Sequence, residues 1–182
     1  DMDSRNAPAL AKIAENCGIK AITVHGRTRN QFYKGKSDWP FIAKVKDTVS
    51  IPVIGNGDVT CIEDAKTLLN QSGADGVMIG RGCYGRPWFP SQVIHYLKTG
   101  ELLPDPPLAE QLSMLLEHYN GILSHYGSHA GIRIARKHIG WYSKGLPGSA
   151  DFRAKVMSGT NEKSVVAMIK DFYEPLIERK AA

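Results

Sequence analysis

The sequence is poor in cysteine, and it has no long run of apolar residues. Its only cysteines are Cys17, Cys61 and Cys83, and no two of them form a C-x-x-C pair. Such a scattered set argues against a disulfide framework or a zinc site and fits a reducing compartment. No stretch approaches the roughly 18 apolar residues that a membrane-spanning helix needs. We therefore expect a cytoplasmic protein with no bound metal ion and no membrane partner.

The short motifs of several large enzyme classes are also missing. The sequence holds no G-x-S-x-G, no H-E-x-x-H and no P-loop, which argues against the usual forms of serine hydrolase, zinc protease and P-loop nucleotidase. No pair of side chains looks like a catalytic dyad, so we assign no catalytic residue. Cys83 lies beside a glycine-rich stretch, but we interpret it as a small packing residue and not as a nucleophile.

The first hundred residues alternate between helical patterns and short apolar runs. Expected strands cover residues 19–24, 51–55 and 75–79, and expected helices cover residues 6–17, 39–47 and 61–72. Strands rich in Val and Ile that alternate with helices indicate a parallel sheet covered on both faces. Thr60 and Glu63 match a capping box at the start of the third helix, and Gly73 is expected to end it.

Three strands cannot close a barrel. If the parent fold is a TIM (β/α)8 barrel, the chain carries about three of its eight βα units. The helix expected over residues 6–17 ends at Gly18, and no strand is predicted before it. We therefore expect the chain to be the C-terminal part of a longer protein.

Beyond a proline-rich linker the pattern is helical only. The linker holds Pro104, Pro106 and Pro107, and the helices expected after it cover residues 108–126, 129–143, 149–157 and 162–179. We assign residues 1–103 to the C-terminal part of a barrel and residues 104–182 to a small all-helical bundle.

Glycine and polar residues follow each expected strand. The three segments are His25-Gly26-Arg27, Asn56-Gly57-Asp58 and Gly80-Arg81-Gly82. Parallel α/β proteins bind ligands at the carboxyl ends of their strands, and barrels commonly bind phosphate at the last two. Gly80 lets the backbone approach a ligand, and the Arg81 guanidinium can bind phosphate in a bidentate manner. We therefore predict a phosphate site here.

Each of these segments has a structural alternative, which for Gly80-Arg81-Gly82 is a glycine-rich connector with a surface arginine. Asn56-Gly57 is the favoured pair of a type I′ turn, but such turns join antiparallel strands, and here a helix follows. We favour a site in which Asn56 and Gly57 help to hold the phosphate, while Asp58 binds a ligand hydroxyl or orients Arg81. His25 can donate to a ligand or serve only as a structural group, and Arg27 and Arg29 are expected on a solvent-exposed loop where they can touch substrate phosphates.

The positive charge of the chain is concentrated in its second half. The net charge is +5, and residues 121–157 hold one acid, Asp151, and six cations, Arg133, Arg136, Lys137, Lys144, Arg153 and Lys155. On a helix, one face holds His129, Arg133, Arg136 or Lys137, and Gly140, and another holds Ile132, Ala135 and Ile139. The basic face indicates a polyanionic partner such as nucleic acid, with a solvated helix face as the alternative. Trp141 and Tyr142 are expected in the core.

Four stretches in this order carry a resemblance to a known family. They are ITVHGRTRNQFYKGKSDW, IPVIGNGDV, MIGRGCYGRPWF and RIARKHIGWYSKGLPG. Together they closely resemble the bacterial tRNA-dihydrouridine synthases, in particular the B-type branch. The resemblance implies an FMN-binding TIM barrel followed by a helical tRNA-binding domain. It also implies that NADPH reduces FMN, that the C5–C6 double bond of a tRNA uridine is then reduced, and that a cysteine supplies the proton.

The resemblance also implies roles for individual residues. Those expected to hold the FMN phosphate and ribityl chain are Asn56, Gly57, Asp58, Gly80 and Arg81, with His25 near the flavin. Those expected to face tRNA are Arg133, Arg136, Lys137 and Lys144. None of the three cysteines lies in the family's cysteine motif, so we expect these 182 residues alone not to reduce uridine.

Two other functions fit part of the sequence. An FMN-dependent oxidoreductase of a small molecule would explain the strand ends but not the basic helices. A non-catalytic RNA-binding fragment would explain the helices but not the polar strand ends.

Overall fold

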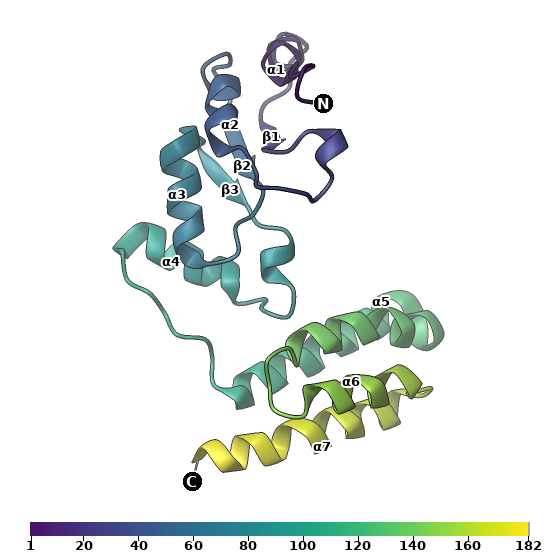
Figure 1. The fold of residues 1–182 in the computed structure, drawn as a ribbon. Coiled ribbons are helices and arrows are strands. Elements are labelled where there is room, and N and C mark those ends of the chain that lie inside the picture. The colour runs from purple at the N-terminus through teal and green to yellow at the C-terminus, as the bar shows by residue number, and fades with distance from the viewer. Residues whose placement is uncertain (182) are drawn as a thin grey trace. The chain divides into compact units, whose positions relative to one another are not determined.

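The computed structural model describes residues 1–181 (Figure 1). Its strands are β1 (Ile22–His25), β2 (Val53–Asn56) and β3 (Gly76–Met78). Its α-helices are α1 (Ala7–Asn16), α2 (Trp39–Lys46), α3 (Ile62–Ser72), α4 (Phe89–Thr99), α5 (Leu108–Tyr142), α6 (Ser149–Ser158) and α7 (Glu162–Ala181). Two short 3-10 helices are η1 (Arg29–Gln31) and η2 (Arg81–Cys83).

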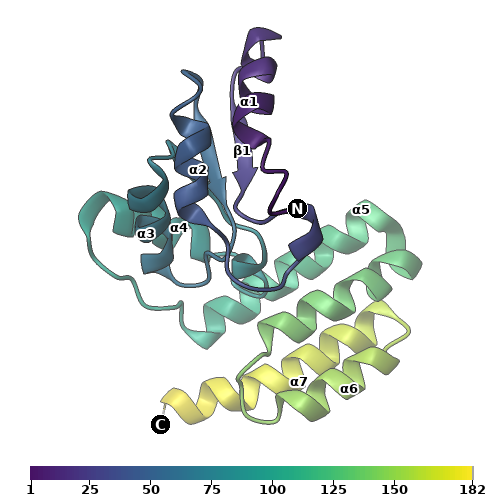
Figure 2. The ribbon, with the colours of Figure 1, turned by 45° about the horizontal axis from the view of Figure 1, so that its top comes forward.

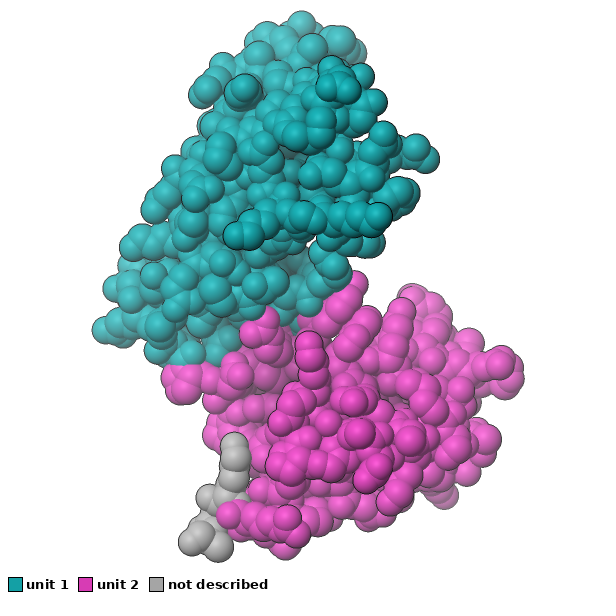
Figure 3. All heavy atoms as spheres, viewed as in Figure 1, with its two compact units in different colours: residues 1–83, 89–103 teal, residues 84–88, 104–182 magenta. Residues whose placement is uncertain are grey.

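The chain divides into two compact units, which Figure 3 shows in different colours. Unit 1 consists of Asp1–Cys83 and Phe89–Leu103. Unit 2 consists of Tyr84–Trp88 and the chain from Pro104 onward. Unit 2 thus takes in a short segment from within the range 1–103 that the sequence assigned to the first domain.

Unit 1 is built on a parallel sheet in the order β1-β2-β3. Ile22 pairs with Val53, and Ile54 pairs with Gly76. This confirms the predicted α/β pattern of three parallel strands. α1 packs against α2, and α2 packs against α3.

The helices of unit 1 cover one face of this sheet, not both as predicted. Alternate residues of a strand point to opposite faces. Val24 and Val53 are buried in a cluster with Ile42 and Val45 of α2, whereas Thr23 and Met78 on the opposite face are exposed. The strand residues therefore alternate between a buried and an open face.

The start of α3 is capped one residue away from the predicted pair. Asp64, and not Glu63, reaches back to the chain before the helix. Its Oδ2 atom accepts hydrogen bonds from the backbone N of Thr60 at 2.8 Å and from that of Cys61 at 2.9 Å. Gly73 ends the helix in the left-handed conformation, with a φ of 62°, as predicted.

Unit 2 consists mainly of α5, α6 and α7, which lie side by side (Figure 2). α5 is interrupted at Gly127, where φ is 73° and ψ is 164°, and this confirms the predicted break between two helical stretches. Ile132, Ala135 and Ile139 are buried in the apolar core of unit 2, as their spacing predicts. Tyr142 is also buried, but Trp141 stays partly exposed, so the expectation for this pair was only half right.

None of the helices in the described part of the chain has both the length and the apolar character needed to cross a membrane. Among residues 1–181, no cluster of three or more His, Cys, Asp or Glu side chains could hold a metal ion.

Candidate functional site

The carboxyl ends of the three strands meet at one edge of the sheet. His25 at the end of β1 lies in register with Asn56 of β2, and Asn56 lies in register with Met78 of β3. The structure therefore brings together the polar residues that the sequence singled out after separate strands.

Asn56 links its two neighbouring strands through its side chain. Its Oδ1 atom lies 2.8 Å from Nδ1 of His25, and its Nδ2 atom donates to the carbonyl of Met78 at 2.8 Å. Because Oδ1 is an acceptor, Nδ1 of His25 carries the hydrogen, and Nε2 of a neutral imidazole is then an acceptor. His25 is exposed, so its ring can meet a ligand at this edge.

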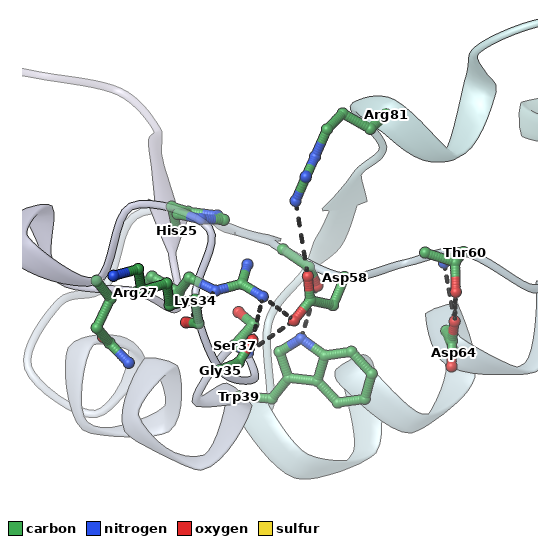
Figure 4. Close-up of polar contacts among 12 residues, drawn as sticks. His25, Arg27, Lys34, Gly35, Ser37, Trp39, Asp58, Thr60, Asp64 and Arg81 are labelled. Atoms are coloured by element: carbon green, nitrogen blue, oxygen red, sulfur yellow. Dashed lines mark hydrogen bonds and ion pairs between the residues drawn. The ribbon is translucent and has the colours of Figure 1, made fainter. Parts of the chain in front are cut away.

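Asp58 is the centre of a second set of contacts (Figure 4). Its Oδ2 atom accepts from Nη2 of Arg27 at 2.5 Å and from the backbone N of Ser37 at 2.8 Å. Its Oδ1 atom lies 4.0 Å from Nη2 of Arg81. One carboxylate thus connects the loops that follow all three strands.

The pKa of Asp58 reflects these contacts. Burial would raise it, but the hydrogen bonds from Arg27 and Ser37 and the positive charges of Arg27 and Arg81 outweigh burial. They hold the pKa of Asp58 below its ordinary value of 3.8. Asp58 is therefore ionised at neutral pH and cannot donate a proton there.

The backbone before Asp58 needs glycine. Gly57 has a φ of 121°, and a Cβ placed on it would lie 2.3 Å from Oγ of Ser37 and 3.0 Å from Cε1 of His25. The carbonyl of Gly57 accepts a hydrogen bond from Nε1 of Trp39 at 2.8 Å. Gly57 therefore lets the loop that holds Asp58 lie close to the end of β1.

Arg27 differs from its sequence interpretation as a solvent-exposed cation that touches substrate phosphates. Its side chain is only 4% exposed. It donates to Asp58, to the carbonyl of Gly35 at 2.7 Å and to the carbonyl of Lys34 at 3.3 Å. Within the described residues its Nη1 atom is buried without a hydrogen-bond partner. Arg27 therefore holds the loop between β1 and α2 in place. The sequence around an Arg in a loop does not indicate such a structural role.

Arg81 keeps its charge available at the surface. Its side chain is 53% exposed, and its guanidinium carbon lies 4.3 Å from the ring centroid of Tyr33. A Cβ placed on the neighbouring Gly80 would meet no atom within 4 Å. Because Asp58 already pairs closely with Arg27, the positive charge of Arg81 is only weakly compensated. The site can therefore attract an anion beside Gly80 and Arg81.

The four cations predicted to face nucleic acid differ in their surroundings. Arg133, Lys137 and Lys144 are exposed in unit 2. Arg136 is partly buried, and its Nη2 atom donates to the carbonyl of Gly159, at the end of α6, at 3.0 Å. Its Nε atom is buried and has no hydrogen-bond partner in the described chain. Arg136 thus has a structural contact that its place in the helical pattern did not indicate.

The three cysteines lie in three different settings. Cys17 and Cys61 are exposed, and Cys83 is half-buried. Cys83 packs against the apolar cluster that contains Val59 and Phe89, in line with its interpretation as a packing residue. Burial raises the pKa of Cys61, which disfavours its thiolate form.

Comparison with known proteins relates the chain to one enzyme family. The model of the family described as Dihydrouridine synthase (Dus) matches residues 1–177. A probable tRNA-dihydrouridine synthase of Rickettsia conorii is 56% identical over 98% of this chain and 54% of its own length. The tRNA-dihydrouridine synthase B of Xanthomonas axonopodis pv. citri is 47% identical over 97% of this chain and 53% of its own length. The chain spans about half the length of the curated relatives it matches.

Proposed function

Since the chain belongs to the dihydrouridine synthase family, we propose that the full-length protein reduces the C5–C6 double bond of specific tRNA uridines. FMN is the cofactor and NADPH the reductant in this proposal. The names of the relatives, tRNA-dihydrouridine synthase and its B form, support the substrate. The observation that carries the proposal in this chain is the cationic edge formed by Gly80 and Arg81 after β3.

We propose further that unit 1 contributes the C-terminal βα units of a TIM barrel. The parallel order β1-β2-β3 supports this assignment. So does the division of the sheet into a helix-covered face and an open face, because barrel strands have helices outside and side chains packed inside. The polar residues at the carboxyl ends then lie on the face of the barrel that carries active sites.

The residues at the strand ends fit the phosphate of FMN. Gly80 leaves open space beside the backbone, and the half-exposed guanidinium of Arg81 is held between Asp58 and the ring of Tyr33. Asn56 and Gly57 shape the neighbouring strand end, and His25 offers a ring nitrogen to the flavin. When bound, FMN would supply the hydride that uridine accepts.

Asp58 serves as a positioning group in this proposal. It is ionised, and its charge orients Arg81 while Arg27 and Ser37 hold the carboxylate in place. A carboxylate in direct contact with a phosphate would repel it. Asp58 is bound to Arg27 and faces Arg81. This arrangement therefore suits an orienting role better than direct contact with phosphate.

Unit 2 supplies the tRNA-binding surface in this proposal. Arg133, Lys137 and Lys144 are exposed and can bind phosphates. Arg136 adds positive charge nearby, although its guanidinium also holds Gly159. We assign no catalytic residue to the described chain and expect the 182 residues alone to form no dihydrouridine in tRNA.

The decisive experiment compares FMN with riboflavin, which lacks the phosphate. The affinity of the full-length protein for each is measured by fluorescence titration, with Arg81→Met as the variant and Lys44→Met, an exposed cation on α2, as the control. Loss of a charge-assisted phosphate contact should weaken FMN binding by about tenfold or more. Riboflavin binding should not change. Equal effects on both ligands would contradict a phosphate role for Arg81.

The same protein then separates the three candidate functions. Dihydrouridine formed in tRNA with NADPH supports the proposed synthase. Bound flavin without affinity for tRNA would point to an oxidoreductase of a small molecule. Affinity for tRNA without bound flavin would point to a non-catalytic RNA-binding protein.

A further inference from the structure

Tyr84 and Trp141 form a parallel ring stack in unit 2. Their ring centroids lie 4.0 Å apart and their planes differ by 12°. Tyr84 is 48% exposed, while Trp141 is partly buried. The stack therefore fixes the orientation of an aromatic side chain that still presents much of its surface to solvent.

The chain around Tyr84 is anchored so that this stack can form. Gly85 has a φ of 73°, and a Cβ placed on it would lie 2.4 Å from the carbonyl carbon and oxygen of Trp141. Trp88 is buried, and its Nε1 atom donates to Oδ1 of Asp105 at 2.8 Å. Anchoring of the segment that directly follows Tyr84 lowers the entropy that Tyr84 would lose on binding a partner.

Cations of α5 lie on the same side of the helix as this stack. Arg133, Lys137 and Trp141 are spaced four residues apart, so they share one face. Nζ of Lys137 lies 5.9 Å from the ring centroid of Trp141, and Arg133 is exposed one turn earlier. The surface thus combines two positive charges with an exposed aromatic ring, and Tyr84 and Lys137 both lie against the ring of Trp141.

We propose that Tyr84 stacks against an unpaired base of the RNA whose phosphates are bound by Arg133 and Lys137. The inference rests on the proposed tRNA function and adds a base-contacting residue to it. Single-stranded RNA is bound by surfaces that place aromatic rings beside cations, because every base has a face that can stack and every linkage carries a negative charge. An acidic protein partner would need the cations but not the aromatic ring.

A crosslinking experiment tests the contact without changing the protein. A tRNA transcript with 4-thiouridine incorporated at low density is irradiated in complex with the full-length protein, and the crosslinked peptides are identified by mass spectrometry. We expect a crosslink in the peptide that contains Tyr84. Crosslinks on the peptides of α5 with none on that of Tyr84 would overturn the inference.

Substitution provides the energetic test. Tyr84→Leu keeps an apolar side chain but removes the ring, and loss of one stacked base should weaken tRNA binding by about tenfold. The slope of affinity against salt should stay unchanged, because no phosphate contact is lost. Tyr84→Phe keeps the stack and should restore the affinity. Tyr126→Leu is the matched control, since Tyr126 on α5 is 53% exposed and contacts the ring of His125 instead of Trp141.

The outcomes separate this inference from the function on which it rests. If the unsubstituted protein has no measurable affinity for tRNA, the proposed tRNA function fails and the inference fails with it. If that protein binds tRNA and Tyr84→Leu binds equally well at the same salt concentrations, the inference alone is wrong. Circular dichroism and thermal unfolding of each variant show whether a loss of affinity reflects a loss of fold.

Discussion

The Oδ2 atom of Asp58 accepts a hydrogen bond of 2.5 Å from the guanidinium of Arg27. The two residues are 31 positions apart in the sequence and follow different strands. Arg27 is almost fully buried, whereas Asp58 has a side chain that is 28% exposed and also faces Arg81. This ion pair ties the loop after β1 to the strand end that carries the candidate phosphate site.

We expect Asp58→Asn to destabilise the protein by about 2 kcal/mol, because the buried guanidinium of Arg27 loses its charge-assisted partner. Urea unfolding of the full-length protein measures the change. Affinity for FMN should also fall, because Arg81 loses the charge that orients it. Asp47→Asn, at an exposed position at the end of α2, is the control and should stay within about 0.5 kcal/mol of the original protein. Equal stability of the two variants would contradict a structural role for Asp58.

The close approach of Gly85 to α5 gives a second prediction. Gly85 and Gly145 both have positive φ values, 73° and 87°, but only Gly85 has a backbone within reach of an added Cβ. Gly145→Ala should cost about 1 kcal/mol from backbone strain alone. Gly85→Ala adds a clash with Trp141 and should cost about 2 kcal/mol more.

Thermal unfolding and near-ultraviolet circular dichroism of the two glycine variants check this difference. The dichroism signal of the aromatic residues should change for Gly85→Ala, because the Tyr84–Trp141 stack is displaced. Gly145→Ala should leave that signal unaltered. Similar losses of stability in both variants would mean that the segment around Gly85 moves away from α5 at little cost.

We expect a pair of histidines to make the stability of unit 2 depend on pH. The rings of His118 and His138 lie 4.9 Å apart, and Nδ1 of His118 lies 3.3 Å from the hydroxyl of Tyr142. Burial lowers the pKa of His118 below 6.5. Burial also lowers the pKa of His138, with smaller contributions from the charges of His118 and Lys137.

Proton linkage gives the direction in which stability changes with pH. A histidine with a lowered pKa in the folded state takes up its proton more readily when unfolded, so stability falls as the pH drops through about 6.5 towards the lowered values. The carboxylates with lowered pKa values lose their contribution only below their ordinary values of 3.8 for Asp58 and 4.5 for Glu15. A loss of stability between about pH 7 and about pH 5 is therefore expected to come from protonation of the histidines.

The expected result is a thermal midpoint that decreases over this pH interval. His138→Gln removes one of the titrating rings and should reduce the decrease. His129→Gln, at an exposed position on the same helix, should leave it as it is. A pH profile that is identical in all three proteins would show that the half-buried rings of His118 and His138 do not control it.

Apolar runs and glycine positions were enough to predict most of the helices and strands. The three strands, the break at Gly127 and the end of α3 at Gly73 follow from local patterns, because each depends on residues close in sequence. α4 was missed. One of its buried positions holds Gln92, whose Nε2 atom donates to the carbonyl of Leu103 at 3.2 Å. A polar residue in a core position obscures the apolar spacing on which such predictions depend.

The sequence predicted which residues lie together at the strand ends, but it did not predict the contacts that hold them there. Strand ends identified Asn56, Asp58 and Arg81, since parallel strands bring their carboxyl ends together. The sequence did not identify Ser37 and Trp39 as supports of that loop, and it interpreted Arg27 as exposed. These contacts join residues that are 18 to 31 positions apart, and no local pattern encodes which distant partner a polar side chain meets.

The two neighbouring cations Arg136 and Lys137 give the last prediction, because the structure separates their roles. Arg136 donates to the carbonyl of Gly159, so Arg136→Met should destabilise the protein by about 1–2 kcal/mol. Lys137 is exposed, so Lys137→Gln should change stability by less than about 0.5 kcal/mol.

In tRNA binding we expect the larger effect from Lys137→Gln and the smaller one from Arg136→Met. Lys137→Gln should reduce the slope of log affinity against log salt by about one, and Arg136→Met should change it less. Titrations at several salt concentrations, paired with urea unfolding, measure both quantities. A larger change of slope for Arg136→Met would show that Arg136 leaves Gly159 to bind phosphate.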